Sequence, residues 1–294
     1  MRALITGGSG FVGTHLRRHL EASGDVVAIS DIETDITDAD AIAAAVAEYA
    51  PDAIYHLAAL SHVGESWDNP SSVLSVNVIG TANVLAAARR AGVERVLVTS
   101  SADVYGSVDA SALPLSETSP VAPANPYAAS KAAAEVMCMQ AWRSFGQGVI
   151  IARPFNHIGP GQSTRFAVPG LASRILEAQA ASAPSLLVGN LAAQRDFTDV
   201  RDIVMGYRAL IVDGSPGEVY NLSSGTAVSL ADVVAMLQSI IGTTLELQTD
   251  EALLRPLDTP VLKGDAQKIQ ASVGWRPRLD LETSLRDIVA SLKN

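Results

Sequence analysis

The sequence predicts an α/β protein: a doubly wound parallel sheet followed by a smaller C-terminal α/β lobe. Three observations predict it. In the first half of the 294 residues, short runs rich in β-branched residues alternate with helix-like stretches. The short runs are apolar throughout, as is typical of parallel strands that helices bury on both faces. After Pro154 the rhythm changes, because a run rich in Gly and Pro precedes shorter elements.

The expected strands of the sheet are short and lie at residues 2–6, 26–30, 53–57, 95–100 and 149–153. Helices are predicted between them at residues 10–22, 39–49, 71–91 and 127–145. Each strand–helix–strand unit of this kind places its two strands side by side and parallel. The order therefore predicts one parallel sheet with helices on both faces.

The second half is expected to start with an ordered loop at residues 156–163. Helices follow at 168–180, 200–212, 230–241, 265–272 and 281–292, with strands at 186–189 and 218–222. We expect a first domain at 1–155 plus roughly 196–220, and a second lobe at 156–195 and 221–294. Open sheets bind ligands beyond the carboxyl ends of their strands, so the second lobe is expected to cover that edge.

Composition excludes several classes of protein. Hydrophobic residues make up 48% and charged residues 18% of the chain, which is too apolar for a disordered protein. The net charge of −10 argues against non-specific binding to nucleic acid or to an anionic membrane. No apolar run approaches the ~20 residues of a membrane span, and no secretory leader is expected. A single cysteine, Cys138, fits a reducing compartment, so a cytoplasmic location is expected.

A glycine-rich turn follows the first strand directly. Gly8, Gly10 and Gly13 match the spacing GxGxxG, and Gly7, Gly10 and Gly13 match GxxGxxG. Because the turn joins a strand to a helix, it predicts a dinucleotide site with the pyrophosphate at the helix N-terminus. The predicted cofactor contacts in this turn are Gly7, Gly10, Phe11, Val12 and Gly13. A turn that only packs the helix on the sheet is the alternative.

An acidic residue, Asp31, follows the second strand, where a carboxylate accepts hydrogen bonds from the adenosine ribose and repels a 2′-phosphate. No Lys or Arg lies between Arg18 and Arg89. NADH is therefore favoured over NADPH, although both cofactors stay open. Further predicted cofactor contacts are Asp35, Ile36, Leu57, Ala58, Ala59 and Asn77.

A second motif, Tyr127-Ala-Ala-Ser-Lys131, lies on an expected helix. Residues at i and i+4 share one helix face, so the Lys131 ammonium is expected beside the Tyr127 phenol, lowering its pKa from ~10. Such a phenol exchanges a proton with a carbonyl or alcohol while a hydride moves to or from nicotinamide. Ser101, at a strand end, is expected to bond the reacting oxygen. Ser101, Tyr127 and Lys131 are the predicted catalytic residues, and the latter two are also expected to contact the cofactor.

Several runs together resemble one family. GGSGFVG at 7–13, HLAA at 56–59, TSSADVYG at 99–106, NPYAASK at 125–131 and RPFNHIGPGQ at 153–162 are similar to motifs of the extended short-chain dehydrogenase/reductase family. Its fold is a Rossmann domain with a C-terminal nucleotide-sugar lobe. VGNLAAQRDFTDVRDI at 188–203, RPLDTPVLKGD at 255–265 and GWRPRLDLETSL at 274–285 resemble its branch of GDP-mannose dehydratases and reductases. The resemblance covers essentially the whole chain.

The resemblance implies that a GDP-4-dehydro-6-deoxy-sugar is reduced at C4 by NADH or NADPH, giving GDP-6-deoxy-D-mannose (GDP-D-rhamnose). The 4,6-dehydratases of the family use a Glu two places after the active-site Ser or Thr, aided by a polar neighbour. Here the run is Ser101-Ala102-Asp103. Ala102 donates no proton and Asp103 is one methylene shorter, and displacing a base by about 1 Å can cost ~100-fold. Reduction is therefore favoured; a dehydratase, a 4-epimerase and a non-catalytic nucleotide sensor are the alternatives.

A GDP-sugar carries a diphosphate, so an acidic protein needs arginines placed locally. Arg195 and Arg255 match family positions that grip nucleotide and phosphate, and Asn156 matches the family's sugar-phosphate Asn. The predicted substrate contacts are Ala102, Asp103, Asn156, Arg195, Arg255 and Asp258, with the alternative that Asp103 only holds local backbone N–H groups. No metal is expected. The Ala-rich helices at 83–91 and 127–145 resemble those that the family pairs in a four-helix homodimer interface.

Overall fold

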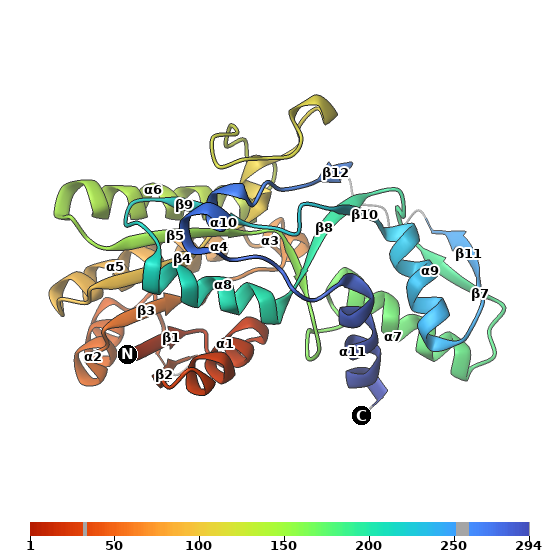
Figure 1. Cartoon of the computed structure of the whole chain (residues 1–294), viewed down its shortest axis with the longest axis horizontal. Coiled ribbons are helices and arrows are strands. Elements are labelled where there is room, and N and C mark those ends of the chain that lie inside the picture. The colour runs from red at the N-terminus through yellow and green to blue at the C-terminus, as the bar shows by residue number, and fades with distance from the viewer. Residues whose placement is uncertain (32–33, 251–258, 294) are drawn as a thin grey trace.

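The computed structural model describes residues 1–31, 34–250 and 259–293. Within these ranges a parallel sheet of six strands has the order β2-β1-β3-β4-β5-β9 (Figure 1). The strands are β1 (Arg2–Thr6), β2 (Val26–Ser30), β3 (Ala53–His56), β4 (Arg95–Thr99), β5 (Val149–Pro154) and β9 (Val219–Leu222). The chain starts at β1, adds β2 on one side and β3 on the other, and so is doubly wound. The predicted fold class is confirmed.

Helices cover both faces of this sheet. One face carries α1 (Phe11–Ala22) and α8 (Val200–Asp213), which pack on each other. The other carries α2 (Ala39–Tyr49), α5 (Thr81–Arg90) and α6 (Pro126–Phe145). Successive strand residues point to opposite faces, so Ile5 packs with the first group and Leu4 with the second. Both side chains are fully buried, which explains why the strands are continuously apolar.

The segment before α5 is continuous with it. It consists of α4 (Pro70–Leu74) and a π-helical turn (Ser75–Gly80), and the short helix α3 (Val63–Ser66) precedes it. Together Pro70–Arg90 form a helical stretch that is long and apolar enough, by length and composition alone, to cross a membrane. In the structure α4 and α5 both pack against α6, and α5 also packs against α2. The stretch is thus one of the helices that cover the sheet.

The second lobe holds two small sheets. In one, β8 (Gln194–Asp199) pairs with β10 (Ala227–Ser229), β12 (Val261–Leu262) and β6 (Asn156–Ile158). In the other, β7 (Ser185–Val188) pairs with β11 (Glu246–Thr249). The helices α7 (Ala167–Ala180), α9 (Leu230–Ile241) and α11 (Leu281–Lys293) pack around one apolar core that includes Leu171, Val233 and Leu285. Figure 1 shows this lobe at the end of the molecule away from α2 and α5.

Several details differ from the sequence-based expectations. The predicted loop at 156–163 begins with the strand β6, and the predicted single helix at 71–91 contains the π-helical turn. The strands β8, β10, β11 and β12 and the helix α3 were not predicted. These strands have two to six residues each, and β8 reads QRDFTD, which carries no continuous apolar signal. The domain boundaries stay a prediction. The strand pairings place β8 in a sheet of the second lobe and β9 in the six-stranded sheet of the first domain.

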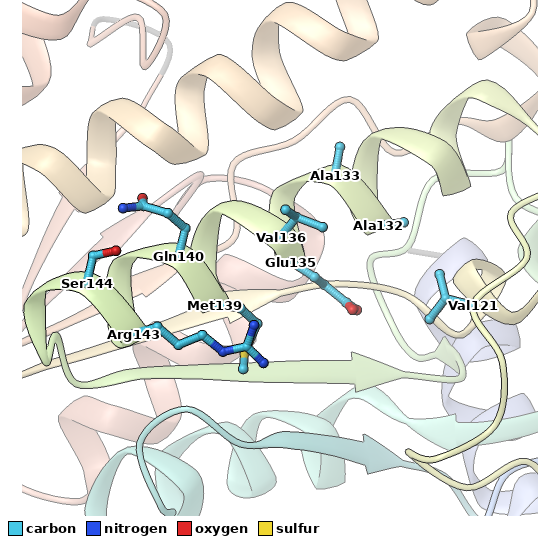
Figure 2. Close-up of a pocket in the computed structure, with 9 residues that line it drawn as sticks. All are labelled: Val121, Ala132, Ala133, Glu135, Val136, Met139, Gln140, Arg143 and Ser144. Atoms are coloured by element: carbon cyan, nitrogen blue, oxygen red, sulfur yellow. The ribbon is translucent and has the colours of Figure 1, made fainter.

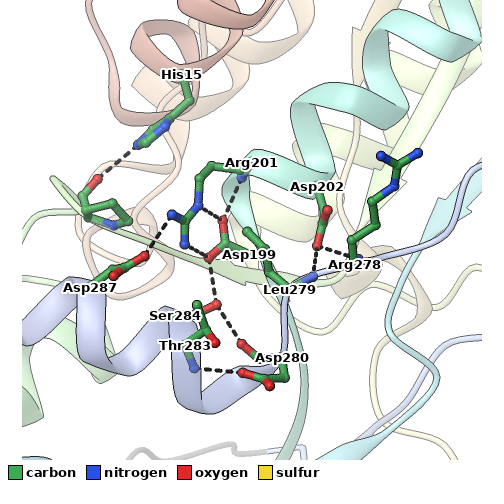
Figure 3. Close-up of polar contacts among 11 residues, drawn as sticks. His15, Asp199, Arg201, Asp202, Arg278, Leu279, Asp280, Thr283, Ser284 and Asp287 are labelled. Atoms are coloured by element: carbon green, nitrogen blue, oxygen red, sulfur yellow. Dashed lines mark hydrogen bonds and ion pairs between the residues drawn. The ribbon is translucent and has the colours of Figure 1, made fainter.

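Polar side chains join the two parts near α8 (Figure 3). Asp199 is fully buried and accepts hydrogen bonds from Arg201 Nε at 2.8 Å and from Ser284 Oγ on α11 at 2.6 Å. Asp202 accepts from the backbone N–H groups of Arg278 and Leu279, each at 2.9 Å. The acidic residues of the run DVRD therefore fix the segment that enters α11. The helix α10 (Gln267–Val273), which precedes α11, packs on α8 and β9.

Candidate active site

The glycine-rich turn is packed tightly against the strand ends beside it. Gly7 has φ +74°, and a Cβ there would lie 2.8 Å from the backbone nitrogen of Ala58. A Cβ on Gly13 would lie 2.4 Å from the carbonyl oxygen of Gly7. Neither contact leaves room for a side chain, because both partners are backbone atoms. The structure therefore brings the predicted residues of the turn against the end of β3, where Leu57 and Ala58 follow.

The turn leads into α1, and its geometry suits a pyrophosphate. Gly10 is the N-cap residue of α1 and has no side chain that caps the first turn. The first free N–H groups of a helix, together with its dipole, form a site for anions. Phe11 and Val12 follow in this first turn and are half-buried. The backbone donors and the absence of side chains thus fit the phosphates of a dinucleotide.

Asp31 lies beside this turn. Its Oδ2 accepts a hydrogen bond from the backbone N–H of Ser9 at 2.7 Å, so the carboxylate is held next to the loop. Asp35 accepts from Thr37 N and Oγ1, both at 2.8 Å, which lowers the pKa of its carboxyl group. Ile36 is buried in the core beneath α2 and α5. Asp35 and Ile36 therefore have structural roles, and their cofactor contacts stay predictions.

A chain of buried hydrogen bonds links the turn to α6. Thr81 Oγ1 donates to the carbonyl oxygen of Asn77 at 2.6 Å, so it accepts from His56 Nε2 at 3.0 Å. His56 Nδ1 then accepts from Thr6 Oγ1 at 2.7 Å. Burial, with a smaller contribution from Lys131, lowers the pKa of His56 to about 3, so the ring is neutral. The chain fixes one tautomer of His56.

Asn77 continues this chain toward the helix that carries Tyr127. Its Nδ2 donates to Leu60 O at 3.0 Å and to Ser130 Oγ at 2.9 Å, and its Oδ1 accepts from Leu60 N at 2.8 Å. Its side chain is fully buried. These bonds connect the segment after β3, which includes Ala59, with α6. Asn77 therefore positions backbone around the predicted cofactor site, and direct contact with the cofactor stays a prediction.

Ser101 and Tyr127 come together at the carboxyl end of β4. The Ser101 hydroxyl lies near enough to the Tyr127 phenol to lower its pKa, and the Asp103 carboxylate acts on the same phenol. Burial and, to a smaller extent, the Asp103 carboxylate raise the pKa of Tyr127 above its usual value. The Ser101 hydroxyl acts in the opposite direction and lowers this pKa. The expectation that Lys131 lowers this pKa is wrong for this arrangement. The Lys131 ammonium instead donates to the carbonyl oxygen of Thr99 at 2.7 Å.

Lys131 is buried one helical turn after Tyr127. Burial lowers its pKa to about 8, while Cys138 and Glu135 act in the opposite direction. The amine is thus mainly protonated at neutral pH and loses its charge as the pH rises through about 8. The Tyr127 phenol is neutral over the same range, because its pKa is raised.

The predicted substrate residues lie on two parts of the molecule. Ala102 is buried and Asp103 half-buried in a 3₁₀ turn (Ala102–Tyr105) whose N-cap, Ser101, accepts the N–H of Asp103 at 3.1 Å. Asn156 is exposed on β6 and pairs with Phe197 of β8. On β8, Arg195 Nη1 donates to Thr259 O at 2.7 Å. Asn156 and Arg195 thus lie on neighbouring strands of the second lobe. Arg255 and Asp258 lie outside the described residues.

A buried polar cluster beside these residues was not predicted. Glu135, Arg153 and Tyr105 bond to one another beneath the end of β4. One signal for it was present in the sequence, because Glu135 follows Lys131 by four residues and so shares its helix face. The partners come from other elements, which a spacing rule within one helix does not reach.

The doubly wound sheet, the glycine-rich turn and the paired Ser101 and Tyr127 define a short-chain dehydrogenase/reductase of the extended kind, as the resemblance predicted. Residues 27–288 match the family model described as GDP-mannose 4,6 dehydratase, and the chain belongs to this family.

Curated relatives cover nearly the whole chain. It is 37% identical to a GDP-6-deoxy-D-mannose reductase from Pseudomonas aeruginosa, over 98% of this chain and 96% of the relative. It is 31% identical to a UDP-glucose 4-epimerase from Mycolicibacterium smegmatis, over 100% of this chain and 99% of the relative. Among solved structures, RMD from Pseudomonas aeruginosa complexed with NADPH superposes with a TM-score of 0.92 at 36% identity, covering 100% of this chain and 99% of that chain.

Proposed function

We propose that the protein reduces the C4 ketone of a GDP-4-dehydro-6-deoxy-sugar with NADH or NADPH, giving GDP-6-deoxy-D-mannose (GDP-D-rhamnose). The observation that carries this proposal is that Ser101 lies beside Tyr127 and is followed in the chain by Ala102 and Asp103 rather than by a polar residue and Glu. A ketone reductase needs a proton donor at the carbonyl oxygen and no base at C5. The 37% identity to a reductase of this class supports the choice of substrate.

Each catalytic side chain has a role in this reaction. A bound nicotinamide supplies the hydride for C4. Tyr127 donates the proton to the C4 oxygen, and its raised pKa keeps the phenol protonated before transfer. Ser101 bonds the same oxygen and orients it. The Lys131 ammonium lies one helical turn away and donates to the carbonyl oxygen of Thr99, so it holds the end of β4 that leads to Ser101.

The remaining predicted contacts are assigned by position. We propose that Gly7, Gly10, Phe11, Val12 and Gly13 hold the pyrophosphate at the start of α1. The segment of Leu57, Ala58 and Ala59 lies against this turn and is proposed to border the cofactor. Asn156 and Arg195, together with Arg255, are proposed to hold the diphosphate of the substrate, and Asp258 is proposed to accept hydrogen bonds from the guanine edge or the ribose. Ala102 and Asp103 are proposed to contact the sugar. We also propose that the protein acts in the cytoplasm.

A coupled assay tests the function. A separate dehydratase converts GDP-mannose into the 4-keto-6-deoxy sugar nucleotide, and the absorbance of NADH or NADPH is followed after this protein is added. Oxidation that requires both proteins is the expected result. Consumption of GDP-mannose by this protein alone would instead make Asp103 a C5 base and the protein a dehydratase. Conversion of a sugar nucleotide to its C4 epimer without net oxidation would favour an epimerase.

We propose NADH as the preferred cofactor, because the Asp31 carboxylate is held beside the glycine-rich turn. Asp31→Asn is expected to raise the ratio of kcat/KM for NADPH to that for NADH about 10-fold, since repulsion of a 2′-phosphate is removed. The measurement compares initial rates with each cofactor in the coupled assay. Asp38→Asn is the control: it removes a nearby exposed charge, and Asn still caps α2. An unchanged ratio in Asp31→Asn would contradict the proposed preference.

We propose that α5 and α6 pair with the same helices of a second copy. The outward side of α6 carries a pocket of about 650 Å³ with a mainly apolar lining that includes Val136, Met139 and Val121 (Figure 2). Val136 is 67% exposed, and Val121, which lines the same pocket, is 44% exposed. Exposed apolar side chains in a group are typical of a protein interface. A second copy would remove them from water.

Val136→Glu is expected to shift the protein from dimer to monomer, because it would bury an unpaired carboxylate at the centre of this interface. Light scattering at matched concentration measures the mass. Val212→Glu serves as the control, since it places the same substitution on an exposed position of α8, on the other face of the sheet. A monomeric parent protein, or a dimeric Val136→Glu, would contradict this interface.

A further inference from the structure

Glu135 and Arg153 form a buried ion pair behind the proposed catalytic residues. Arg153 Nε donates to Glu135 Oε1 at 2.8 Å, and Arg153 Nη2 donates to Oε2 at 2.6 Å. Glu135 is 7% exposed and Arg153 4% exposed. Figure 2 shows the Glu135 side chain leaving α6 on the side of β5, the strand that carries Arg153. The pair therefore joins the helix of Tyr127 to the sheet.

The same pair holds both ends of the segment that contains Ser101. At the start of the segment, Ser100 Oγ donates to Glu135 Oε1 at 2.5 Å. At its end, Arg153 Nη1 donates to Tyr105 Oη at 2.9 Å. The Tyr105 hydroxyl has one proton, which it donates to Asn221 Oδ1 on β9 at 2.7 Å. Ser101 lies between two anchored positions, and so do Ala102 and Asp103.

The charge of Glu135 is also placed next to Lys131. Titratable groups that face Lys131 or Tyr127, among the described residues, are Glu135 and Cys138 on α6, His56 on β3, Asp103 in the 3₁₀ turn and Tyr207 on α8. Burial raises the pKa of the Cys138 thiol far above its usual value, so this thiol is neutral at pH 7. His56 is neutral as well. Of the two groups that raise the pKa of Lys131, Glu135 is the one that also forms the ion pair with Arg153.

We propose that Glu135 is a positioning residue for the proton transfer: through Ser100 and through Arg153 with Tyr105 it holds Ser101 at the phenol, and it shares the helix face of Lys131. The inference rests on the proposed function for its effect on turnover. A purely structural role is the competing explanation. Replacing a buried ion pair by apolar groups is often neutral for stability, so stability alone would not require a carboxylate here.

The test removes the pair as a unit, because Glu135→Gln alone would leave a buried, unpaired guanidinium. In Glu135→Gln/Arg153→Met, kcat at pH 7 is expected to fall about 10-fold while KM stays within about twofold, since substrate binding groups are unchanged. In the parent protein kcat is expected to fall as the pH rises through about 8, and in the double variant this fall is expected about 1 pH unit lower. Tyr105→Phe keeps the ion pair of Glu135 and Arg153. It is expected to lower kcat without changing the pH at which kcat falls on the alkaline side.

A second readout needs no substrate. The chain has four lysines, Lys131, Lys263, Lys268 and Lys293, so a ¹³C NMR titration of labelled lysines resolves Lys131, which Lys131→Arg assigns. Its midpoint is expected near pH 8 in the parent protein and about 1 unit lower in the double variant. Ser284→Ala is the control, because it deletes another buried hydrogen bond, far along the chain on α11, and should leave the midpoint unchanged.

The possible outcomes separate the two proposals. A Lys131 midpoint that stays at its parent value in the double variant overturns the role of Glu135, as does a kcat–pH profile that coincides with that of an active parent. A parent protein that oxidises neither NADH nor NADPH with the 4-keto substrate overturns the proposed function instead. In that case a lowered Lys131 midpoint still supports the placement of the Glu135 charge.

Discussion

Tyr127→Phe is expected to lower kcat for ketone reduction by about 10³-fold, within the range that a positioned general acid contributes. Affinity for the reduced nicotinamide should change less than about twofold, because only the hydroxyl beside Ser101 is lost and the buried ring remains. Single-turnover oxidation in the coupled assay gives the rate. A fluorescence titration of NADH gives the dissociation constant.

A matched control separates chemistry from packing. Tyr55 is fully buried on β3, and its hydroxyl has no hydrogen-bond partner in the described part of the chain. Tyr55→Phe removes the same atom from the core and should leave kcat close to that of the parent. A Tyr127→Phe variant that keeps more than about a tenth of the parent rate would show that another group donates the proton.

The elements of the fold that could be predicted are those whose sequence pattern lies within one short stretch of the chain. β1 and the helix after it follow from an apolar run, a glycine cluster and helical spacing within 22 residues. The pairing of Tyr127 with Lys131 on one helix face follows from the i, i+4 rule. The position of Ser101 required one more step, that strand ends of a parallel sheet meet at one edge. The structure agrees at each of these points.

The parts that were missed depend on contacts between distant segments. The side chain of Lys131 bonds to Thr99, which lies on another element, so its effect on Tyr127 was wrongly predicted. The cluster of Glu135, Arg153 and Tyr105 draws on α6, β5 and the 3₁₀ turn. The short strand β8 is held by Asp196, a buried carboxylate that accepts the backbone N–H groups of residues 224, 225 and 264. Burial of such polar groups is decided by tertiary structure.

Asn77 shows the same limit at the cofactor site. Its place in the helix predicted at 71–91 suggested a polar contact with the cofactor, which stays a prediction; in the structure its amide binds the backbone of Leu60 and the side chain of Ser130. A single sequence offers no way to separate an amide that meets a ligand from one that positions backbone. The guanine nucleotide of the proposed substrate likewise rests on the family resemblance and on the similarity to known proteins, because no single residue identifies the base.

Gly13→Ala is expected to weaken binding of NADH and NADPH about 100-fold and to lower the free energy of unfolding by about 2 kcal/mol. The added Cβ would lie 2.4 Å from the carbonyl oxygen of Gly7 and 2.6 Å from the Cα of Gly8. Both partners are backbone atoms, so α1 must move away from the turn. The N–H groups of its first turn would then no longer face the pyrophosphate.

Fluorescence titration and denaturant unfolding measure the two effects of Gly13→Ala separately. Gly242→Ala is the matched control: Gly242 ends α9 at φ +79° with nothing within 4 Å of an added Cβ, so the change costs about 1 kcal/mol of backbone strain. That variant should lose stability without losing cofactor affinity. If Gly13→Ala behaved like the control, close packing of α1 on the turn would serve stability only, and the cofactor site would have to lie elsewhere along the sheet edge.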